Sequence, residues 1–217
     1  MSILSVENLS LKIGTENILG GISFRLDQGR ILAITGESGS GKSMTALSII
    51  QLQPKNAKLE GEIFFHDQEI TKKAEFELCK IRGAKIGMIF QEPMTALNPV
   101  KTVGDQISET IILHSTKNKK SADKETLKIL ERVGLSPAAE VKKRYPHELS
   151  GGQRQRVVIG IAIALKPSII IADEPTTALD VTTQAQILVL LKKLVTEDNI
   201  AMVLITHDLA VVADMAD

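Results

Sequence analysis

The 217-residue sequence lacks the features of several large classes of protein. Its single cysteine, Cys79, excludes an internal disulfide framework and any cysteine-based zinc or iron–sulfur site, and we expect it to be a small, half-buried hydrophobic residue. The 26 basic and 26 acidic residues cancel, so no basic excess indicates a nucleic-acid surface. The longest apolar run, 157–165, is too short to span a bilayer, and segment 1–10 does not have the composition of a signal peptide. We therefore expect a cytosolic protein, or one held at a membrane only by partners, that binds no nucleic acid.

Hydrophobic residues make up 43% of the chain and charged residues 24%, which is typical of a globular domain. The apolar patterning predicts strands at 22–26, 31–35 (covered on both faces), 62–65, 86–90, 168–172 and 201–206. It predicts helices at 42 to about 52, 102–114, 122–133, 152–165 and 181–195, with the polar segment 115–124 as a solvated connection. The alternation of strand and helix predicts a parallel α/β sheet, and the mostly helical stretch from about 93 to 150 is predicted to be an inserted lobe.

A glycine-rich loop separates the expected strand 31–35 from the first expected helix. Residues 36–43 read Gly-Glu-Ser-Gly-Ser-Gly-Lys-Ser, which fits the phosphate-binding pattern G-x-x-x-x-G-K-[ST] in its strand–loop–helix context. The glycines let backbone N–H groups turn inward around an anion, and the helix contributes its positive N-terminal end. Lys42 can reach the β- and γ-phosphates of a nucleotide, and the Ser43 hydroxyl is a suitable oxygen ligand for Mg²⁺.

A second apolar strand ends in two carboxylates. Asp173 and Glu174 follow the run 169–172, and Pro175 comes next. Asp173 is suited to hold Mg²⁺ through water, whereas Glu174 could accept a proton from an attacking water or orient that water. Taken alone, the pattern would fit equally well a strand that simply ends at a polar turn. Together with the phosphate-binding loop, it predicts a site for a nucleoside triphosphate and Mg²⁺.

A third motif indicates the family. Leu149-Ser150-Gly151-Gly152-Gln153 resembles the signature motif of ATP-binding-cassette (ABC) ATPases, and it lies between the phosphate-binding loop and Asp173, as in that family. Gln91 resembles the Q-loop glutamine, 177–180 the D-loop and His207 the switch histidine. Six motifs in the family order make the chain similar to ABC ATPases over nearly its whole length. The stretches that resemble the ATPase subunits of peptide and nickel importers are 91–99, 145–150 and 172–181.

The resemblance implies a P-loop NTPase-type α/β fold with a mainly parallel sheet, an antiparallel β subdomain and an inserted helical lobe. The whole of 1–217 would be a single ABC ATPase domain. Its core would comprise 1–92 and about 150–217, and the lobe, about 93–150, would end at the signature motif. Relatives continue beyond the switch histidine, so we expect the C-terminal part of the family domain to be absent from this chain.

The resemblance also implies an activity, partners and site residues. Two ATPase subunits, identical or paralogous, would face each other with ATP between them and drive two membrane permease subunits, which are served by a solute-binding protein. The chain would hydrolyse ATP with Mg²⁺ at the cytoplasmic face of the cell membrane to energise import of peptides or of nickel and other metal complexes. Catalysis would involve Lys42, Glu174 and His207, and Mg²⁺ would be held by Ser43, Gln91 and Asp173. The nucleotide would be bound by Gly36, Glu37, Ser38, Gly39, Ser40, Gly41, Lys42, Ser43, Thr45, Gln91, Ser150, Gly152, Gln153 and Asp180.

One departure from the family concerns the nucleotide base. Many relatives stack an aromatic residue of the first strands on adenine, whereas residues 9–14 here read Leu-Ser-Leu-Lys-Ile-Gly, so Leu11 or Ile13 would have to pack against the base. This departure keeps open a nucleotide-gated module with little hydrolysis, although Glu174 and His207 favour an active ATPase.

Two non-transport alternatives fit the sequence less well. Chromosome-type ABC proteins separate the phosphate-binding loop from the signature motif by long coiled coils, but Lys42 and Ser150 are only 108 positions apart and no sustained heptads lie between them. Translation-type ABC factors carry two cassettes in one chain, and this chain holds one.

Overall fold

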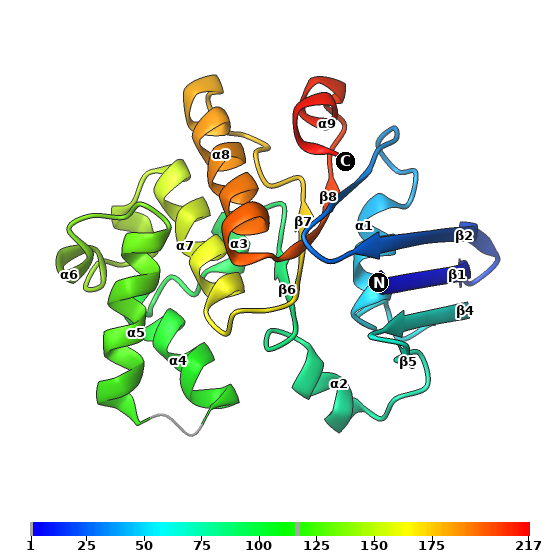
Figure 1. Ribbon diagram of the computed structural model, residues 1–217, viewed down its shortest axis with the longest axis horizontal. Coiled ribbons are helices and arrows are strands. Elements are labelled where there is room, and N and C mark those ends of the chain that lie inside the picture. Colours follow the sequence, from blue (N-terminus) through cyan, green and yellow to red (C-terminus); the bar gives the residue numbers. More distant parts are fainter. Residues whose placement is uncertain (1, 116–117) are drawn as a thin grey trace.

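The computed structural model describes residues 2–115 and 118–217, and a parallel sheet lies near its centre (Figure 1). The sheet consists of β3 (Ile31–Ile34), β6 (Ile86–Ile89), β7 (Ile169–Asp173) and β8 (Ala201–Ile205), in the order β3-β8-β7-β6. All neighbouring strands are parallel. The inner strands β7 and β8 are buried along their whole length, as expected for a sheet covered on both faces. Because the strands are parallel, their carboxyl ends meet at one edge, which is where ligands bind in open α/β sheets.

A second sheet is antiparallel and supports the helix that follows the glycine-rich loop. It consists of β1 (Ser2–Ile13), β2 (Glu16–Asp27), β4 (Ala57–Phe65) and β5 (Gln68–Glu69), in the order β2-β1-β4-β5. Leu4 and Leu9 of β1 are fully buried and share one hydrophobic cluster with Ile49 of α1 (Lys42–Ile49) and Val203 of β8. Helix α1 therefore packs between the two sheets, as Figure 1 also shows.

Most of the remaining helices lie between β6 and β7 in the sequence. They are α3 (Pro93–Ala96), α4 (Val103–His114), α5 (Lys119–Arg132), α6 (Ala138–Val141), the short 3-10 helix η1 (Pro146–Glu148) and α7 (Gly151–Ile163). In Figure 1, α4, α5 and α6 lie on the side of the parallel sheet away from the antiparallel sheet, with α7 between them and the strands. Ile107 of α4, Leu130 of α5 and Ile159 of α7 join one hydrophobic cluster with Ile170 of β7. This insertion therefore shares a core with one face of the parallel sheet.

Three further helices flank the sheet. α2 (Glu75–Ile81) precedes β6, α8 (Val181–Asp198) follows β7, and α9 (Leu209–Met215) follows β8. Asp180 caps the first turn of α8, and Asp208 caps that of α9, because each carboxylate accepts a hydrogen bond from a backbone N–H there. Both caps lie just after loops that leave the carboxyl edge of the sheet.

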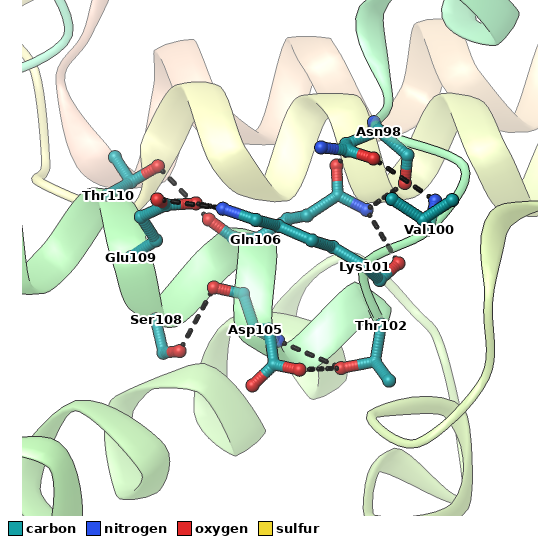
Figure 2. Close-up of polar contacts among 9 residues, drawn as sticks. All are labelled: Asn98, Val100, Lys101, Thr102, Asp105, Gln106, Ser108, Glu109 and Thr110. Atoms are coloured by element: carbon teal, nitrogen blue, oxygen red, sulfur yellow. Dashed lines mark hydrogen bonds and ion pairs between the residues drawn. The ribbon is translucent and has the colours of Figure 1, made fainter.

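Side chains of α4 fix the connection that leads into it from α3 (Figure 2). Thr102 caps α4, since its Oγ1 accepts a hydrogen bond from Asp105 N at 3.2 Å and donates one to Asp105 Oδ2 at 2.7 Å. The Gln106 side chain, 8% exposed, accepts from Asn98 N at 2.8 Å and donates to the carbonyl oxygens of Asn98 and Lys101, both at 3.1 Å. One buried amide thus satisfies three backbone groups of the loop 98–101, which therefore has a defined shape although it lies at the surface.

The architecture expected from the sequence is confirmed: a mainly parallel sheet, an antiparallel β subdomain and an inserted group of helices. Strand 31–35 is shorter than expected and is not covered on both faces. Only Ile31 in it is fully buried, because β3 is an edge strand of the described sheet and pairs with β8 alone. The segment 115–124 is not wholly a connection, because α5 already begins at Lys119, capped by Asn118. Residues 116 and 117 of that segment lie outside the described residues.

The expectation for Cys79 is wrong, because the cysteine is exposed. Helix α2, which carries it, has only seven residues and buries only Leu78. The Cys79 side chain lies on the outer face of the helix, with Sγ 3.6 Å from Glu75 Oε1. A helix this short covers the core with one side chain and leaves its neighbours in water.

Candidate nucleotide-binding site

The loop from Gly36 to Gly41 joins β3 to α1 and carries the phosphate-binding pattern. Gly41 stands at the N-cap of α1 with φ of 91°, a left-handed conformation that glycine adopts without strain. A Cβ atom at this position would lie 2.6 Å from Leu19 Cδ2 and 2.8 Å from the Ile18 carbonyl oxygen. Strand β2 therefore packs directly against the base of the loop, so that only glycine fits there.

The Lys42 ammonium group lies over the loop. Its Nζ donates hydrogen bonds to the carbonyl oxygens of Gly36 at 2.8 Å and of Glu37 at 2.7 Å, and the residue is only 8% exposed. Ser38 and Ser40 are exposed beside it, and Ser40 N donates to Glu37 O at 3.2 Å. Lys42 thus holds a positive charge where the loop turns, which is the arrangement that the sequence pattern predicts for phosphate binding.

Thr45, also predicted to contact the nucleotide, lies deeper in α1. Its hydroxyl donates to Gly41 O at 3.1 Å, its backbone N–H donates to the same oxygen, and the residue is 1% exposed. Both of its donors are therefore used inside the helix, and a role in nucleotide binding stays a prediction.

The Asp173 carboxylate at the end of β7 is buried and incompletely paired. The residue is 5% exposed, and its Oδ1 has no hydrogen-bond partner. Burial raises the pKa of Asp173 most strongly, and the nearby Glu174 charge adds to the rise, whereas a hydrogen bond with Ser43 and the charge of Lys42 lower it. A buried carboxylate oxygen without a partner, beside a serine hydroxyl, is a donor set that fits the oxygen preference of Mg²⁺. Ser43 and Asp173 could therefore hold the ion.

The Glu174 carboxylate lies next to Asp173 and is held by side chains from three loops. Gln91, after β6, donates from Nε2 to Glu174 Oε2 at 3.1 Å, and the Thr177 hydroxyl donates to the same oxygen at 2.8 Å. His207, after β8, has Nδ1 3.3 Å from Glu174 Oε1. Glu174 itself has a left-handed backbone with φ of 45°, and its N–H donates to Ile205 O, so the chain turns sharply as it leaves β7. The structure thus brings together Gln91, Glu174 and His207, which the sequence analysis had proposed separately.

The sequence analysis placed Thr177 in the segment that resembles the D-loop, but it did not propose Thr177 as a site residue. It lies three positions after Glu174 in the same loop, and its hydroxyl reaches back to the carboxylate. A hydroxyl residue soon after a strand-end carboxylate is the only sequence feature that could have indicated this contact.

The N-terminus of α7 carries the predicted signature residues in a capping box. Ser150 Oγ accepts from Gln153 N at 3.3 Å, and Gln153 Oε1 accepts from Ser150 N at 3.1 Å. A Cβ atom on Gly152 would lie 2.4 Å from Thr183 Cγ2, so α7 approaches the start of α8 closely at this glycine. Within residues 2–115 and 118–217, no hydrogen bond joins Ser150, Gly152 or Gln153 to the phosphate-binding loop.

Asp180 lies at the same corner, at the start of α8. Its carboxylate accepts from Thr183 N at 3.0 Å and from the Thr183 hydroxyl at 2.7 Å. These hydrogen bonds, the hydroxyl's first, lower the pKa of Asp180 below its usual value. Asp180 therefore caps α8, and its role in nucleotide binding stays a prediction.

The two residues considered for packing against a base differ in access. Leu11 is fully buried in the core of the antiparallel sheet, whereas Ile13, at the end of β1, is only partly buried. Leu11 therefore has no surface to offer a base, and Ile13 is the residue of the two that can contact one.

A parallel sheet with a glycine-rich phosphate loop after one strand and carboxylates after another defines a P-loop nucleotide-binding domain. The chain matches the family described as "ABC transporter" over residues 19–177, and it belongs to that family. The similarity to ABC ATPases inferred from the motifs is therefore confirmed.

Named relatives and a solved structure agree with this assignment. The chain is 51% identical over 199 residues to the oligopeptide transport ATP-binding protein AppD and 50% identical over 221 residues to the dipeptide transport ATP-binding protein DppD, both of Bacillus subtilis (strain 168). These matches cover 91% and 99% of this chain but 61% and 66% of AppD and DppD, so the chain spans less than two thirds of either relative. A dimeric structure of the ATP-binding cassette MJ0796 in a post-hydrolysis state, bound to ADP and Pi, superposes with a TM-score of 0.84 at 34% identity, covering 96% of this chain and 89% of that one.

Proposed function

We propose that this chain is the ATP-binding and ATP-hydrolysing part of a subunit that energises a membrane importer of peptides. The observation that carries the proposal is the meeting of three groups at one edge of the sheet. They are the Lys42 ammonium over the phosphate loop, the unpaired Asp173 Oδ1 and the Glu174 carboxylate held by Gln91 and His207. Together these are the parts that phosphoryl transfer to water requires: phosphate binding, metal binding and a positioned acceptor of a proton.

The phosphate groups of ATP would lie in the loop 36–43, against backbone N–H groups and the N-terminal end of α1. Lys42 would exchange its bonds to the carbonyl oxygens of Gly36 and Glu37 for bonds to phosphate oxygens, which are stronger acceptors because they are charged. Mg²⁺, held by Ser43, Asp173 and Gln91, would neutralise charge on the phosphates. This assignment is supported by the buried Asp173 Oδ1, which has no protein partner.

The Glu174 carboxylate would take a proton from the attacking water. Its two oxygens are already directed, Oε2 by Gln91 and Thr177 and Oε1 toward His207. His207 is exposed and lies at the end of the neighbouring strand β8, from which it would hydrogen-bond the γ-phosphate and help to fix the water. Such groups act mainly in the transition state, so they would affect turnover more than binding.

A second cassette, identical or paralogous, would complete the site. Ser150, Gly152, Gln153 and Asp180 gather at the N-termini of α7 and α8, and within the described residues they are not hydrogen-bonded to the chain's own phosphate loop. In a head-to-tail dimer they would contact the nucleotide of the facing subunit. The dimeric state of the solved relative supports this arrangement.

The proposed organisation assigns different roles to two parts of the chain and to its partners. The segments 1–92 and about 150–217 would form the catalytic core, and about 93–150 would be the lobe that ends at the signature residues. Among the described residues, no helix is both long and apolar enough to cross a membrane. As the family resemblance implies, two permease subunits would hold the chain at the cytoplasmic face, and a solute-binding protein would deliver the substrate to them. The names of AppD and DppD favour peptides over nickel complexes as that substrate.

The test is co-purification with the membrane subunits, followed by measurement of ATP hydrolysis and of peptide uptake into vesicles. The proposal predicts Mg²⁺-dependent hydrolysis that peptide and its binding protein stimulate, and loss of both hydrolysis and uptake in Lys42→Ala. ATP binding without hydrolysis in the complete complex would favour a nucleotide-gated module instead. Stimulation by nickel complexes but not by peptides would overturn the substrate assignment alone.

A further inference from the structure

Arg154 lies in the first turns of α7, directly after Gln153, and connects three segments of the chain. Its Nε donates a hydrogen bond to the Pro146 carbonyl oxygen at 2.7 Å, and its Nη1 lies 2.8 Å from Met94 Sδ. Met94 belongs to α3 and Pro146 to η1. One guanidinium group therefore links α3, η1 and α7.

Two of these segments border the predicted nucleotide contacts. Met94 lies three positions after Gln91, the residue that donates to Glu174 beside the chain's own phosphate loop. Pro146 lies four positions before Ser150, and the intervening Leu149 is buried. Arg154 thus stands between the side chain that contacts Glu174 and the α7 N-terminus proposed to face the second nucleotide.

The short connections on both sides are held by local hydrogen bonds. On the α3 side, the Thr95 hydroxyl and the backbone N–H of Ala96 donate to Glu92 O, so α3 follows Gln91 without a flexible spacer. On the other side, Glu148 Oε2 accepts from Tyr145 N at 2.7 Å, and Leu149 N donates to Pro146 O. Local hydrogen bonds therefore span both connections between the predicted nucleotide contacts and Arg154.

The far end of α3 is fixed as well. The loop 98–101 that follows it is bonded to the Gln106 amide, as Figure 2 shows, and Gln106 belongs to α4. Helix α3 is consequently attached to α7 through Arg154 and to α4 through Gln106. A shift of Gln91 would move α3 together with both helices.

We propose that Arg154 is a positioning residue that couples the two nucleotide sites of the assembled dimer. A nucleotide in the chain's own phosphate loop would bias the position of Gln91 and α3, and Arg154 would transmit this bias to the Ser150–Gln153 turn that completes the facing site. The inference rests on the proposed function and adds to it a named route between the sites. Coupling of this kind requires an element whose arrangement both sites influence, and it acts equally in both directions.

The chain provides a matched control two positions along the same helix. Arg156 makes bonds of the same kind, from Nη1 to Val133 O at 2.7 Å and from Nη2 to Gln186 Oε1 at 3.0 Å, but among the described residues no hydrogen bond joins it to α3 or η1. Arg154→Met and Arg156→Met each remove one guanidinium group and keep an unbranched apolar side chain. Only the first removes the proposed link.

The experiment measures ATP-driven association of cassettes in chains that also carry Glu174→Gln, which retains nucleotide by slowing hydrolysis. Sedimentation at increasing Mg-ATP, alone and with the partner cassette, gives the ATP concentration for half-association, and calorimetry gives ATP affinity of the single chain. Arg154→Met is expected to raise the half-association concentration roughly 2- to 30-fold, the range for changes along a coupling network, with single-chain ATP affinity unchanged. Arg156→Met is expected to leave both quantities unchanged.

Two further variants separate coupling from a general loss of structure. Met94→Leu removes the sulfur acceptor but keeps the apolar volume, so it should produce a smaller shift in the same direction, and no additional shift in Arg154→Met. In a Gln91→Ala chain, Arg154→Met should have no further effect, because the route begins at Gln91.

The inference is wrong if Arg154→Met and its parent need the same ATP concentration for half-association. It is also wrong if Arg156→Met raises this concentration as much as Arg154→Met does, or if Arg154→Met still raises it fully in a Gln91→Ala chain. A parent chain that binds ATP but never associates, alone or with its partner cassette, instead removes the two-cassette part of the proposed function, and the inference with it. The two failures are thus distinguished by the behaviour of the parent chain.

Discussion

Replacing Asp173 by asparagine should make the nucleotide-free protein more stable. Asp173 is 5% exposed, its Oδ1 has no hydrogen-bond partner, and burial raises its pKa. The ionised side chain therefore destabilises the folded protein at neutral pH. Asparagine has the same shape and no charge, and it can keep the hydrogen bond to Ser43 that the carboxylate makes. The substitution removes the desolvated charge and little else.

The expected gain is about 1 kcal/mol, since an unsatisfied buried polar group costs about 1–3 kcal/mol and more when it is charged, and asparagine keeps a polar atom at this position but no charge. We take the low end because the nearby Lys42 charge and the hydrogen bond with Ser43 partly offset the cost of burying the carboxylate. For a chain of this size, a gain of 1 kcal/mol corresponds to a rise in Tm of about 2–4 °C. Asp214→Asn, at an exposed position of α9, is the control and should change stability by less than about 0.5 kcal/mol.

The stability gain of Asp173→Asn over wild type should grow as the pH rises. Because burial raises the folded-state pKa of Asp173 above its usual value, the folded protein binds this proton more tightly than the unfolded chain. Wild-type and Asp173→Asn proteins should therefore be similar below the unfolded-state pKa. Wild type should lose stability relative to the variant as pH rises through the folded-state pKa, and the difference should be constant above it.

Saturating Mg-ATP should reverse the order of stability, so that wild type becomes more stable than Asp173→Asn. A ligand at a hundred times its Kd adds about 2.7 kcal/mol to the stability of the protein that binds it, and we expect full binding of the ion to require Asp173. Thermal unfolding with and without Mg-ATP tests both the stability difference of the nucleotide-free proteins and its reversal by the ligand. A variant that is less stable than wild type without nucleotide would refute the account of Asp173 as an uncompensated buried charge. A variant that Mg-ATP stabilises as much as wild type would refute its role in holding the ion.

Three further predictions concern other residues of the predicted nucleotide site. Lys42→Ala should weaken ATP binding by about 1.5–3 kcal/mol, because it removes a charge-assisted contact to phosphate; unchanged affinity by calorimetry contradicts the phosphate-loop assignment. Glu174→Gln and His207→Ala should keep near-normal ATP affinity but lose about 10²–10⁴-fold in the rate of single-turnover hydrolysis by the assembled transporter. Normal turnover in either variant excludes that residue from catalysis. Ser150→Ala should destabilise the protein by about 0.5–2 kcal/mol in denaturant unfolding, because Gln153 N loses its acceptor, whereas Ser150→Asn should restore most of this stability.

The local parts of the site could be predicted from the sequence because their geometry is contained in a few consecutive residues. The loop 36–43 carries its own turn residues, its lysine and the start of its helix, so spacing alone indicates its shape. The capping box of Ser150 and Gln153 is local in the same sense. The meeting of Gln91, Glu174 and His207 is less local, but it follows once the strands before them are parallel, because parallel strands end at the same edge.

Other parts could not be predicted because they depend on packing between distant segments. Nothing in the sequence indicates that Arg154 reaches Met94, which lies 60 positions away, since the contact requires α3 to pack on α7. The contact of Thr177 with Glu174 depends on the left-handed backbone at Glu174, and that turn is not encoded by a glycine. The exposure of Cys79 follows from how little of α2 touches the core.

The charges at the site favour nucleotide binding because two groups are poorly satisfied without it. Lys42 is bonded to neutral carbonyl oxygens of its own loop, and Asp173 keeps one buried oxygen without a partner. Phosphate would give Lys42 charged acceptors, and a divalent cation would give Asp173 its missing partner, so the two ligands relieve different defects of the same site. Each ligand should bind more tightly in the presence of the other, because the cation and the phosphate groups would attract each other in adjacent positions. In Asp173→Asn, which has no buried charge to relieve, ATP affinity should depend much less on Mg²⁺ than in wild type, and calorimetric titration of ATP with and without Mg²⁺ measures this difference directly. An equal effect of Mg²⁺ in both proteins would place the ion on groups other than Asp173.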